Sequence, residues 1–154
     1  MVLLCEKKTE GGNGSRIKIS ECRSLDFLAV IPSRIEGNPV TELSPYLFSS
    51  HQNYEEEKGP LSFWWSESDG RVEEKEALSL PPLKGKLLKE LCLPPSLEKV
   101  GAYAFYNCEN MKKLEVYSTT LDWGTGVFTG CGRIESVTLH VDEGTLAVRR
   151  GGWT

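Results

Sequence analysis

The chain has 154 residues, of which 39% are hydrophobic and 26% are charged, a composition typical of one globular domain rather than of a disordered or membrane-spanning protein. Its 18 basic and 22 acidic residues give a net charge of -4, which excludes the basic surface that nucleic acids or anionic membranes would require. No apolar run reaches the length of a membrane-spanning helix, so no span is predicted.

The cysteines and the N-terminus bear on where the protein works. Five cysteines, an odd number, occur in a chain without a recognisable signal sequence, which favours free thiols in a reducing compartment. A cytoplasmic location is therefore predicted. The alternative is the cell surface, which would apply if a leader or further domains are missing from this chain.

Residues 1–27 are predicted to form an N-terminal hairpin cap. The glycine cluster Gly11–Gly14 indicates a turn, and the stretches Val2–Cys5 and Ile17–Ile19 on either side of it are typical of strands. This hairpin would cover the first of the repeats that follow, because an uncovered terminal repeat leaves apolar surface and backbone groups exposed.

Residues 28–50 form a first, variant copy of a repeat that recurs later in the chain. The interval from Ile31 to Phe48 is five residues longer than the corresponding interval in the next copy. The extra residues correspond to Glu36–Val40, whose glycine and proline predict a longer turn.

Residues 51–87 interrupt the repeats as an acidic-aromatic insertion. The stretch His51–Glu76 holds eight acidic and three basic residues. Phe63–Glu67 is predicted to return through Arg71–Glu74 as a hairpin that projects from the repeats, and a loose acidic loop is the alternative. The consecutive carboxylates Glu55–Glu57 lack the spacing of a calcium loop, so they indicate a solvated acidic patch.

Residues 88–141 repeat with a period of 23, which is the signature of a solenoid. Each copy contains a triplet with two apolar residues around an outward one, typical of a short strand with one buried face. Stacked at about 4.8 Å, such strands pair in a parallel ladder and merge their inward side chains into one core. The recurring positions are Leu91, Leu114 and Val137; Leu93, Val116 and Leu139; Phe105 and Phe128; and Cys108 and Cys131.

The arm that follows each strand is predicted to turn the chain back. Gly101 and Gly124 stand at the same register and indicate a tight corner. The stretch Ala102–Cys108 is predicted to wind as a helical turn with its apolar side chains inward. Phe105 and Phe128 would then stack as an aromatic spine, each contributing about 1.5–3 kcal/mol through burial.

The segment Pro94–Cys108 closely resembles the bacterial BspA-like leucine-rich repeat. It contains Pro-x-Ser-Leu-x-x-Val-Gly-x-x-Ala-Phe-x-x-Cys, and Val30–Thr41 looks like the opening repeat of that family. The resemblance covers residues 28–50 and 88–141. It implies a β-rich (α+β) leucine-rich-repeat solenoid with a short parallel strand ladder and helical or 3-10 turns. It also implies protein binding or adhesion, often at bacterial cell surfaces.

The chain departs from the family pattern at a few positions. Leu47 and Val127 replace the usual alanine, and Tyr117 stands where the strand-ending proline is expected. Residues 142–154 lose the pattern altogether. No closing cap is therefore predicted, and the C-terminal edge of the ladder would be open.

No catalytic constellation, cofactor site or metal site is predicted. Cys108 and Cys131 would lie on adjacent repeats, but zinc requires four ligands, and neither His51 nor His140 shares their phase. They are predicted to be small buried thiols. Cys92 faces outward, so it is the most reactive thiol if any of the five is reactive, although an inert surface cysteine is favoured.

Partner binding is predicted on surfaces that the repeat does not use for its core. One is the outward strip of the ladder, where His140 is expected beside Glu115; the other is the pair Trp64 and Trp65, because aromatic anchors often carry binding energy. The alternative for the tryptophans is that they fold back as a cover of the solenoid. The strip comprises Glu90, Cys92, Lys113, Glu115, Tyr117, Ser136, Thr138 and His140.

The sequence thus predicts a single domain, 1–154, that acts as a non-enzymatic protein-interaction module. Its partner is expected to be a protein rather than a nucleic acid. A second copy of the chain, bound through the open C-terminal edge, is the other partner considered. The alternative function is a structural segment of a larger cell-surface or adhesin-like protein, completed by another domain or by self-association.

Overall fold

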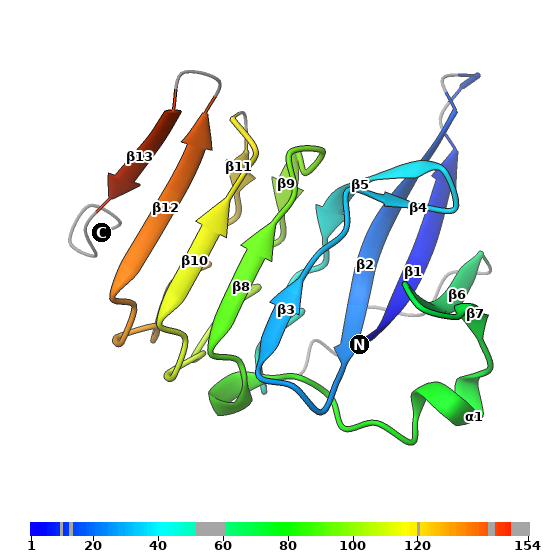
Figure 1. Ribbon diagram of the computed structural model, residues 1–154, viewed down its shortest axis with the longest axis horizontal. Helices are drawn as coiled ribbons and strands as arrows, with labels where there is room; N and C mark the ends of the chain where they lie inside the picture. Colours follow the sequence, from blue (N-terminus) through cyan, green and yellow to red (C-terminus); the bar gives the residue numbers. More distant parts are fainter. Residues whose placement is uncertain (10, 13, 52–60, 120, 142–143, 149–154) are drawn as a thin grey trace.

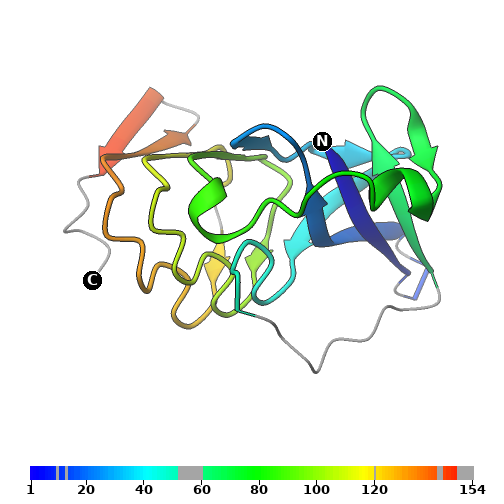
Figure 2. The same ribbon diagram turned by 90° about the horizontal axis from the view of Figure 1, so that it is seen from below.

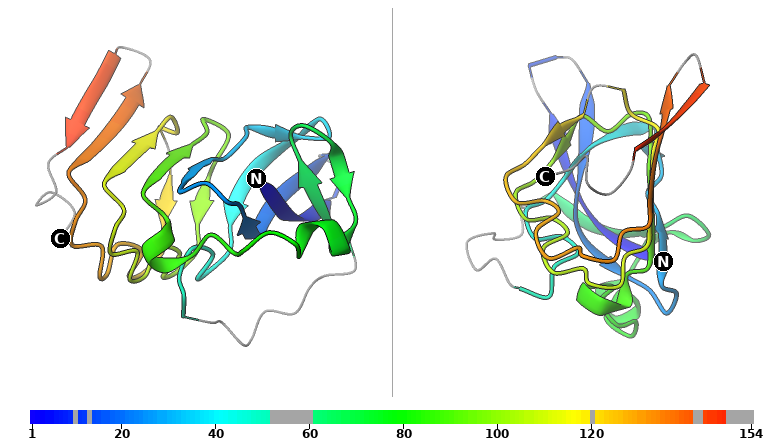
Figure 3. Two further views of the ribbon diagram at one scale, coloured as in Figure 1. Left: turned by 60° about the horizontal axis from the view of Figure 1, so that its bottom comes forward. Right: turned by 90° about the vertical axis from the view of Figure 1, so that its left-hand side faces the viewer.

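The computed structural model describes residues 1–9, 11–12, 14–51, 61–119, 121–141 and 144–148. The chain winds through successive turns that lie side by side along the long axis, with the N-terminal hairpin at one end and the last strands at the other (Figure 1, Figure 2 and Figure 3). The predicted acidic patch Glu55–Glu57 and residues 149–154 lie outside the described residues.

The strands form two sheets. The sheet that contains the predicted parallel strands, called the ladder sheet below, has five strands in the order β13-β12-β10-β8-β3. The other, called the second sheet, has the order β11-β9-β5-β2-β1-β6-β7, with β4 paired to β5 off this path. The strands of the ladder sheet are β3 (Leu28–Val30), β8 (Glu90–Leu93), β10 (Lys113–Val116), β12 (Ser136–Val141) and β13 (Gly144–Val148). Those of the second sheet are β1 (Val2–Thr9), β2 (Ser15–Arg23), β4 (Arg34–Ile35), β5 (Asn38–Leu43), β6 (Ser62–Ser66), β7 (Gly70–Val72), β9 (Lys99–Val100) and β11 (Asp122–Trp123).

The register of the ladder sheet confirms the 23-residue period. Leu114 of β10 lies opposite Leu91 of β8 on one side and opposite Val137 of β12 on the other, all in parallel strands. All three side chains are buried. Because each turn of the solenoid repeats the same path, residues one period apart pair with each other and their side chains stack in the core.

The first copy joins the ladder in the predicted alignment. Ala29 of β3 lies opposite Leu91 in parallel pairing, so the next residue inward, Ile31, takes the position of Leu93. On the second sheet, Leu43 lies opposite Val100. Five more residues therefore separate the two sheets in the first copy than in the second, as the sequence spacing predicted.

The extra residues form a tight β-hairpin. Strands β4 and β5 pair antiparallel, with Ile35 opposite Asn38. The two residues between them, Glu36 and Gly37, have positive φ values of 53° and 80°. Positive φ at both central positions is the geometry of a type I′ turn, which suits the twist of a two-residue hairpin.

The predicted helical turn over Ala102–Cys108 is wrong. The segment forms consecutive turns instead, each closed by a hydrogen bond from a backbone N–H to the carbonyl three residues earlier, as from Ala104 to Gly101. Tyr103 and Asn107 have positive φ values of 56° and 59°. A left-handed residue inside the segment interrupts a right-handed helix, so the arm stays a chain of turns.

The aromatic spine is confirmed and extends one turn further than predicted. The ring centroids of Phe48 and Phe105 are 5.9 Å apart, and those of Phe105 and Phe128 are 5.8 Å apart. Phe105 is fully buried. Cys108 follows the same arm, and its Sγ donates a hydrogen bond to the carbonyl of Phe48 at 3.2 Å, which ties the thiol to the preceding turn.

Gly101 and Gly124 mark the closest approach between successive turns. The Gly101 N–H donates to the carbonyl of Leu43, and the Gly124 N–H donates to the carbonyl of Val100 in the same way. A Cβ at position 101 would lie 2.7 Å from the carbonyl carbon of Ser44. Glycine avoids this clash because it has no Cβ. Close backbone packing, and not the corner alone, thus requires glycine at this register.

The predicted N-terminal hairpin is confirmed. Strands β1 and β2 pair antiparallel, with Cys5 opposite Ile19. Strand β2 then pairs in parallel with β5, so the hairpin continues the second sheet beyond the first turn of the solenoid. It does not extend the ladder sheet, which ends at β3 on this side of the molecule.

Residues 62–72 form the predicted hairpin, but it does not project from the repeats. Strands β6 and β7 pair antiparallel, and β6 also pairs with β1, with Trp64 opposite Leu4. The backbone groups of β6 are therefore satisfied by the sheet rather than by solvent. The chain returns to the repeats through two short helices, α1 (Glu74–Ala77) and the 3-10 helix η1 (Gly85–Leu87).

The C-terminal edge of the parallel ladder was predicted to be open, but strand β13 pairs with β12 there. Strand β13 runs antiparallel to β12, with Leu139 opposite Leu146, and lies at the end of the ladder sheet (Figure 1). An antiparallel neighbour needs only a short connection, so it can close the ladder where the 23-residue pattern has ended. No helix in the described part of the chain is long and apolar enough to cross a membrane.

Candidate functional site

The outward side of the ladder sheet brings together the whole predicted strip. Its residues lie in three rows that cross the parallel strands. The first row is Leu28, Glu90, Lys113 and Ser136, and the second is Val30, Cys92, Glu115 and Thr138. The third row continues the register past the ends of the first strands with Pro32, Pro94, Tyr117 and His140. These three rows are called the outer face below, and the structure places all eight predicted strip residues on it.

The outer face is polar toward β10 and β12. Lys113 Nζ lies 3.8 Å from the Glu90 carboxylate across the strands. His140 Nε2 lies 3.9 Å from Glu115 Oε2, which confirms the expected neighbours. The Lys113, Glu90 and Glu115 side chains are largely exposed, so the Lys113–Glu90 ion pair contributes little to stability and leaves these charges available to a partner, whereas His140 is partly buried.

Tyr117 and His140 form an aromatic plate on this face. Their rings are stacked at 4.0 Å between centroids with an interplanar angle of 4°. The Tyr117 hydroxyl donates to Glu115 Oε2 at 3.4 Å. Partial desolvation, and then the negative charge of Glu115, raise the pKa of the Tyr117 phenol. The phenol therefore stays neutral, and the plate offers a flat apolar surface with a polar edge.

The outer face is apolar toward β3, which the sequence analysis missed. Leu28 is 45% exposed and Val30 is 52% exposed, and Phe27 just before them is 48% exposed. The Lys89 ammonium lies 4.5 Å from the centroid of the Phe27 ring. The alignment of Ile31 with Leu93 already implied that Leu28 and Val30 face outward, so the signal was present in the register.

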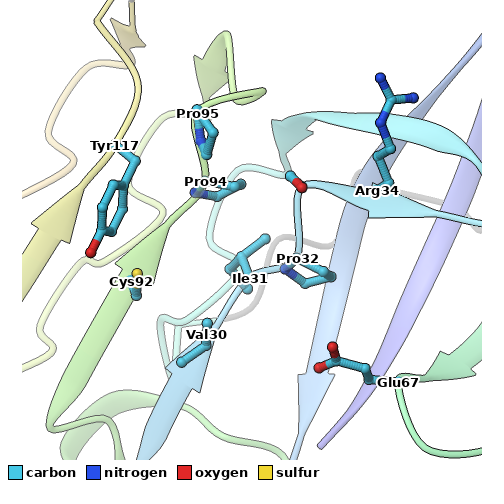
Figure 4. A pocket seen from close by; sticks show the side chains of 10 residues that line it. Val30, Ile31, Pro32, Arg34, Glu67, Cys92, Pro94, Pro95 and Tyr117 are labelled. Carbon is cyan, nitrogen blue, oxygen red and sulfur yellow. The ribbon is translucent and has the colours of Figure 1, made fainter. Parts of the chain in front are cut away.

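A groove of about 490 Å³ lies where the apolar end of the outer face meets the two inserted hairpins. Tyr117 and Cys92 lie on one side of it, and Arg34 and Glu67 lie on the other (Figure 4). Its lining residues are Val30, Ile31, Pro32, Ser33, Arg34, Glu67, Cys92, Pro94, Pro95 and Tyr117.

An ion pair joins the two hairpins that supply Arg34 and Glu67 to this groove. Arg71 of β7 donates from Nε and from one terminal nitrogen to the two carboxylate oxygens of Glu36, at 2.8 and 2.9 Å. The Arg71 guanidinium also lies over the Phe63 ring, 4.1 Å from its centroid. The hydrogen bonds from Arg71 hold the pKa of Glu36 below its ordinary value, so the pair stays charged at neutral pH.

The two tryptophans do not lie on the outer face. Trp64 is 5% exposed and belongs to a small core with Val2, Leu4 and Ala77, so it is not available as a surface anchor. Trp65 is half-buried and packs against the main core. The tryptophans thus cover the N-terminal end of the solenoid, which is the alternative that the sequence analysis considered. Glu67, in the turn after β6, is the residue of this hairpin that lines the groove.

The predicted buried thiols lie in the core. Cys108 and Cys131 are buried, and the Sγ of Cys131 donates to the carbonyl of Phe105 at 3.0 Å. Burial raises the pKa of the Cys131 thiol to about 11 and also raises the pKa of Cys108. Protonated thiols that donate to carbonyls are poor metal ligands. No group of three or more His, Cys, Asp or Glu residues in the described chain is placed to hold a metal ion.

Cys92 is expected to be the thiol that alkylating reagents modify first in the folded protein, because it is half-buried while the other four are buried. Partial burial, and then the charge of Glu115, raise the pKa of its thiol, so labelling by iodoacetamide should be slow at pH 7 and accelerate as the pH rises. Mass spectrometry of native protein labelled at several pH values measures this. The Cys92→Ser variant should lose the label, and modification of Cys108 at the same rate would contradict the prediction.

Comparisons with known proteins agree with this geometry. Residues 83–146 match the family model described as BspA type leucine rich repeat region (6 copies). Neither the search of curated proteins nor the search of solved structures found a match. The matched segment contains β8, β10 and β12, the spine residues Phe105 and Phe128, and the end of the chain's repeat pattern. Residues 83–146 therefore belong to the BspA-type leucine-rich repeats, and the fold around them is a β-rich leucine-rich-repeat solenoid.

Proposed function

We propose that this protein is a non-enzymatic protein-interaction module whose binding surface is the outer face of the ladder sheet. The observation that carries the proposal is the composition of this face. It combines exposed apolar side chains on β3 with the stacked plate of Tyr117 and His140, next to a groove of about 490 Å³. Exposed aliphatic and aromatic residues set among charges are typical of protein-binding surfaces.

The repeat architecture supports a binding role. Its leucines, phenylalanines and phased cysteines are used in the core, so the solenoid presents a rigid face on which outward side chains vary without cost to the fold. A rigid face reduces the entropy lost on association.

The chemistry of the outer face supports binding rather than catalysis. The groove contains one carboxylate, Glu67, one guanidinium, Arg34, and the protonated thiol of Cys92. A nucleophilic mechanism needs a nucleophile hydrogen-bonded to a base, whereas the Cys92 thiol stays protonated and the His140 ring stacks on Tyr117. Glu115, whose carboxylate lies 3.9 Å from His140, faces outward with it.

Partner binding should weaken about tenfold or more in the Tyr117→Ala variant, because truncating a central aromatic anchor commonly costs at least that much affinity. The immobilised protein is first used to isolate its partner from extract of the cells that express it. The purified partner is then titrated against the wild type and the variant by calorimetry. Equal affinity for both would contradict the proposal.

A matched control separates binding from folding. Lys99→Ala changes an exposed residue of β9 in the second sheet, on a different side of the solenoid. We expect this variant to bind the partner with unchanged affinity. Tyr117 is 38% exposed, so both variants should unfold within about 0.5 kcal/mol of the wild type.

We also propose a reducing compartment such as the cytoplasm as the site of action. The five cysteines are free thiols, and four of them are buried. Burial raises the pKa of Cys5 and of Cys22 to about 12, so these thiols resist oxidation. An oxidising environment would therefore not stabilise the fold through disulfide bonds at these positions. Immunofluorescence and cell fractionation test this, and recovery of the protein at the cell surface would contradict it.

A further inference from the structure

Strand β3, at the N-terminal end of the ladder sheet, has one unpaired edge. Strand β3 pairs with β8, and the sheet order places no other described strand beside it. The N-terminal hairpin continues the second sheet only, through the pairing of β2 with β5. The end of the ladder sheet is therefore left without the cap that the end of the second sheet has.

The hydrogen bonds of β3 show which backbone groups face this edge. The carbonyl of Phe27 accepts from Glu90, and the N–H of Ile31 donates to the carbonyl of Cys92. Because bonding groups alternate along a strand, Phe27, Ala29 and Ile31 face β8, whereas the N–H and C=O groups of Leu28 and Val30 face the opposite edge. Unpaired groups in this arrangement are a template for another strand.

The groove lies along this edge and limits what fits there. Figure 4 shows the Glu67 carboxylate pointing from the β6–β7 turn toward the strand that carries Val30, with Arg34 further along the same side. Neither Glu67 nor Arg34 has an ion-pair partner among the described residues; Arg34 donates only to the carbonyl of Gly37, at 3.1 Å. The Glu67 carboxylate thus faces an occupant that lies beside β3, and Arg34 adds a charge of the opposite sign to the lining of the groove.

We propose that the free edge of β3 binds an extended segment of a partner protein by strand addition. The segment pairs its backbone with Leu28 and Val30, places a basic side chain near Glu67 and an acidic one near Arg34, and packs apolar side chains on the outer face. This inference deepens the proposed function and rests on it. Backbone pairing supplies affinity in this mode, and the side-chain positions supply specificity.

The test selects ligands for the full chain from a displayed library of random short peptides. Selected peptides should alternate apolar and polar residues and carry both a basic and an acidic residue. Val30→Pro removes the N–H that faces the free edge and should weaken binding about fivefold or more. Val30→Thr keeps this N–H with a side chain of the same shape, and it should bind within about twofold of the wild type.

Two further measurements do not depend on the proline variant. Each selected peptide is resynthesised with N-methyl groups on alternate residues, in both phases. Strand addition predicts that one phase abolishes binding and that the other retains it, because only alternate N–H groups face β3. When the library is selected for binding to the Glu67→Lys variant, the selected peptides should carry an acidic residue where the wild type preferred a basic one.

Other results would overturn the inference in distinct ways. Peptides that ignore Val30→Pro and N-methylation but are lost in Tyr117→Ala would leave the proposed function intact and refute strand addition. A library that yields no peptide would refute the extended segment as the occupant. Self-association of the purified protein that Val30→Pro abolishes, measured by sedimentation, would show that a second copy occupies the edge instead.

Discussion

Replacing Phe105 with alanine is expected to lower the free energy of unfolding by about 3–5 kcal/mol. Phe105 is fully buried at the centre of the spine, with Phe48 on one side and Phe128 on the other. Its removal opens a cavity between two turns of the solenoid, and their backbones are hydrogen-bonded to each other and cannot collapse to fill it. A loss of this size is a large part of the stability of an ordinary domain.

Urea denaturation followed by tryptophan fluorescence measures this loss. Phe27→Ala is the matched control, because Phe27 is 48% exposed and its truncation leaves no cavity. We expect the control to change the unfolding free energy by less than about 1 kcal/mol. Phe105→Leu, which keeps much of the buried volume, should lose less than the alanine variant. An unchanged midpoint for Phe105→Ala would mean that the spine does not support the fold.

Replacing Gly101 with alanine is expected to destabilise the protein by about 3 kcal/mol, although it adds a single methyl group. The new Cβ would lie 2.7 Å from both the Ser44 carbonyl carbon and the Pro45 ring carbon Cδ. These atoms belong to the backbone and proline ring of the preceding turn, so no side-chain rotation relieves the clash. The two turns would have to separate, which would stretch the hydrogen bond from the Gly101 N–H to Leu43.

The chain supplies a control for this prediction. A Cβ on Gly132 would meet nothing within 4 Å. Gly132→Ala should therefore stay within about 0.5 kcal/mol of the wild type when thermal and urea unfolding are compared. If Gly101→Ala proved as stable as Gly132→Ala, the close packing of turns at this register would be disproved.

The period of 23 residues predicted the central architecture correctly because it is a property of the backbone path. Leu91, Leu114 and Val137 pair in register since each turn of the solenoid uses the same number of residues. The same logic placed Phe105 and Phe128 in one spine and Cys108 and Cys131 in the core.

Local conformation inside the period was less predictable. Tyr103 and Asn107 adopt positive φ values, and tyrosine carries no local preference for that region. The stacking of the Tyr103 ring on Tyr46, at 5.3 Å between centroids, stabilises this geometry through the neighbouring turn. Tyr46 and Gly126, at the same register of the neighbouring turns, also have positive φ, so the repeated backbone path sets an angle that the local sequence at Tyr103 does not encode.

The candidate site, too, could be predicted from the sequence only in part. Alternation along the strands was enough to predict that Glu90, Glu115 and Tyr117 share one face. The groove beside them could not be predicted, because it forms where two inserted hairpins meet. Their junction is the Glu36–Arg71 ion pair, which joins residues far apart in the chain.

The repeat, the core positions and the outward strip could all be predicted from the residues, because periodicity fixes which side chains point the same way. The burial of Trp64, the pairing of β13 with β12 and the free edge of β3 arise only in the folded chain. These outcomes depend on which strands pair across long stretches of chain. Such pairing is selected by the backbone hydrogen bonds and apolar surface that remain unsatisfied after the repeats have stacked, and no local pattern records it.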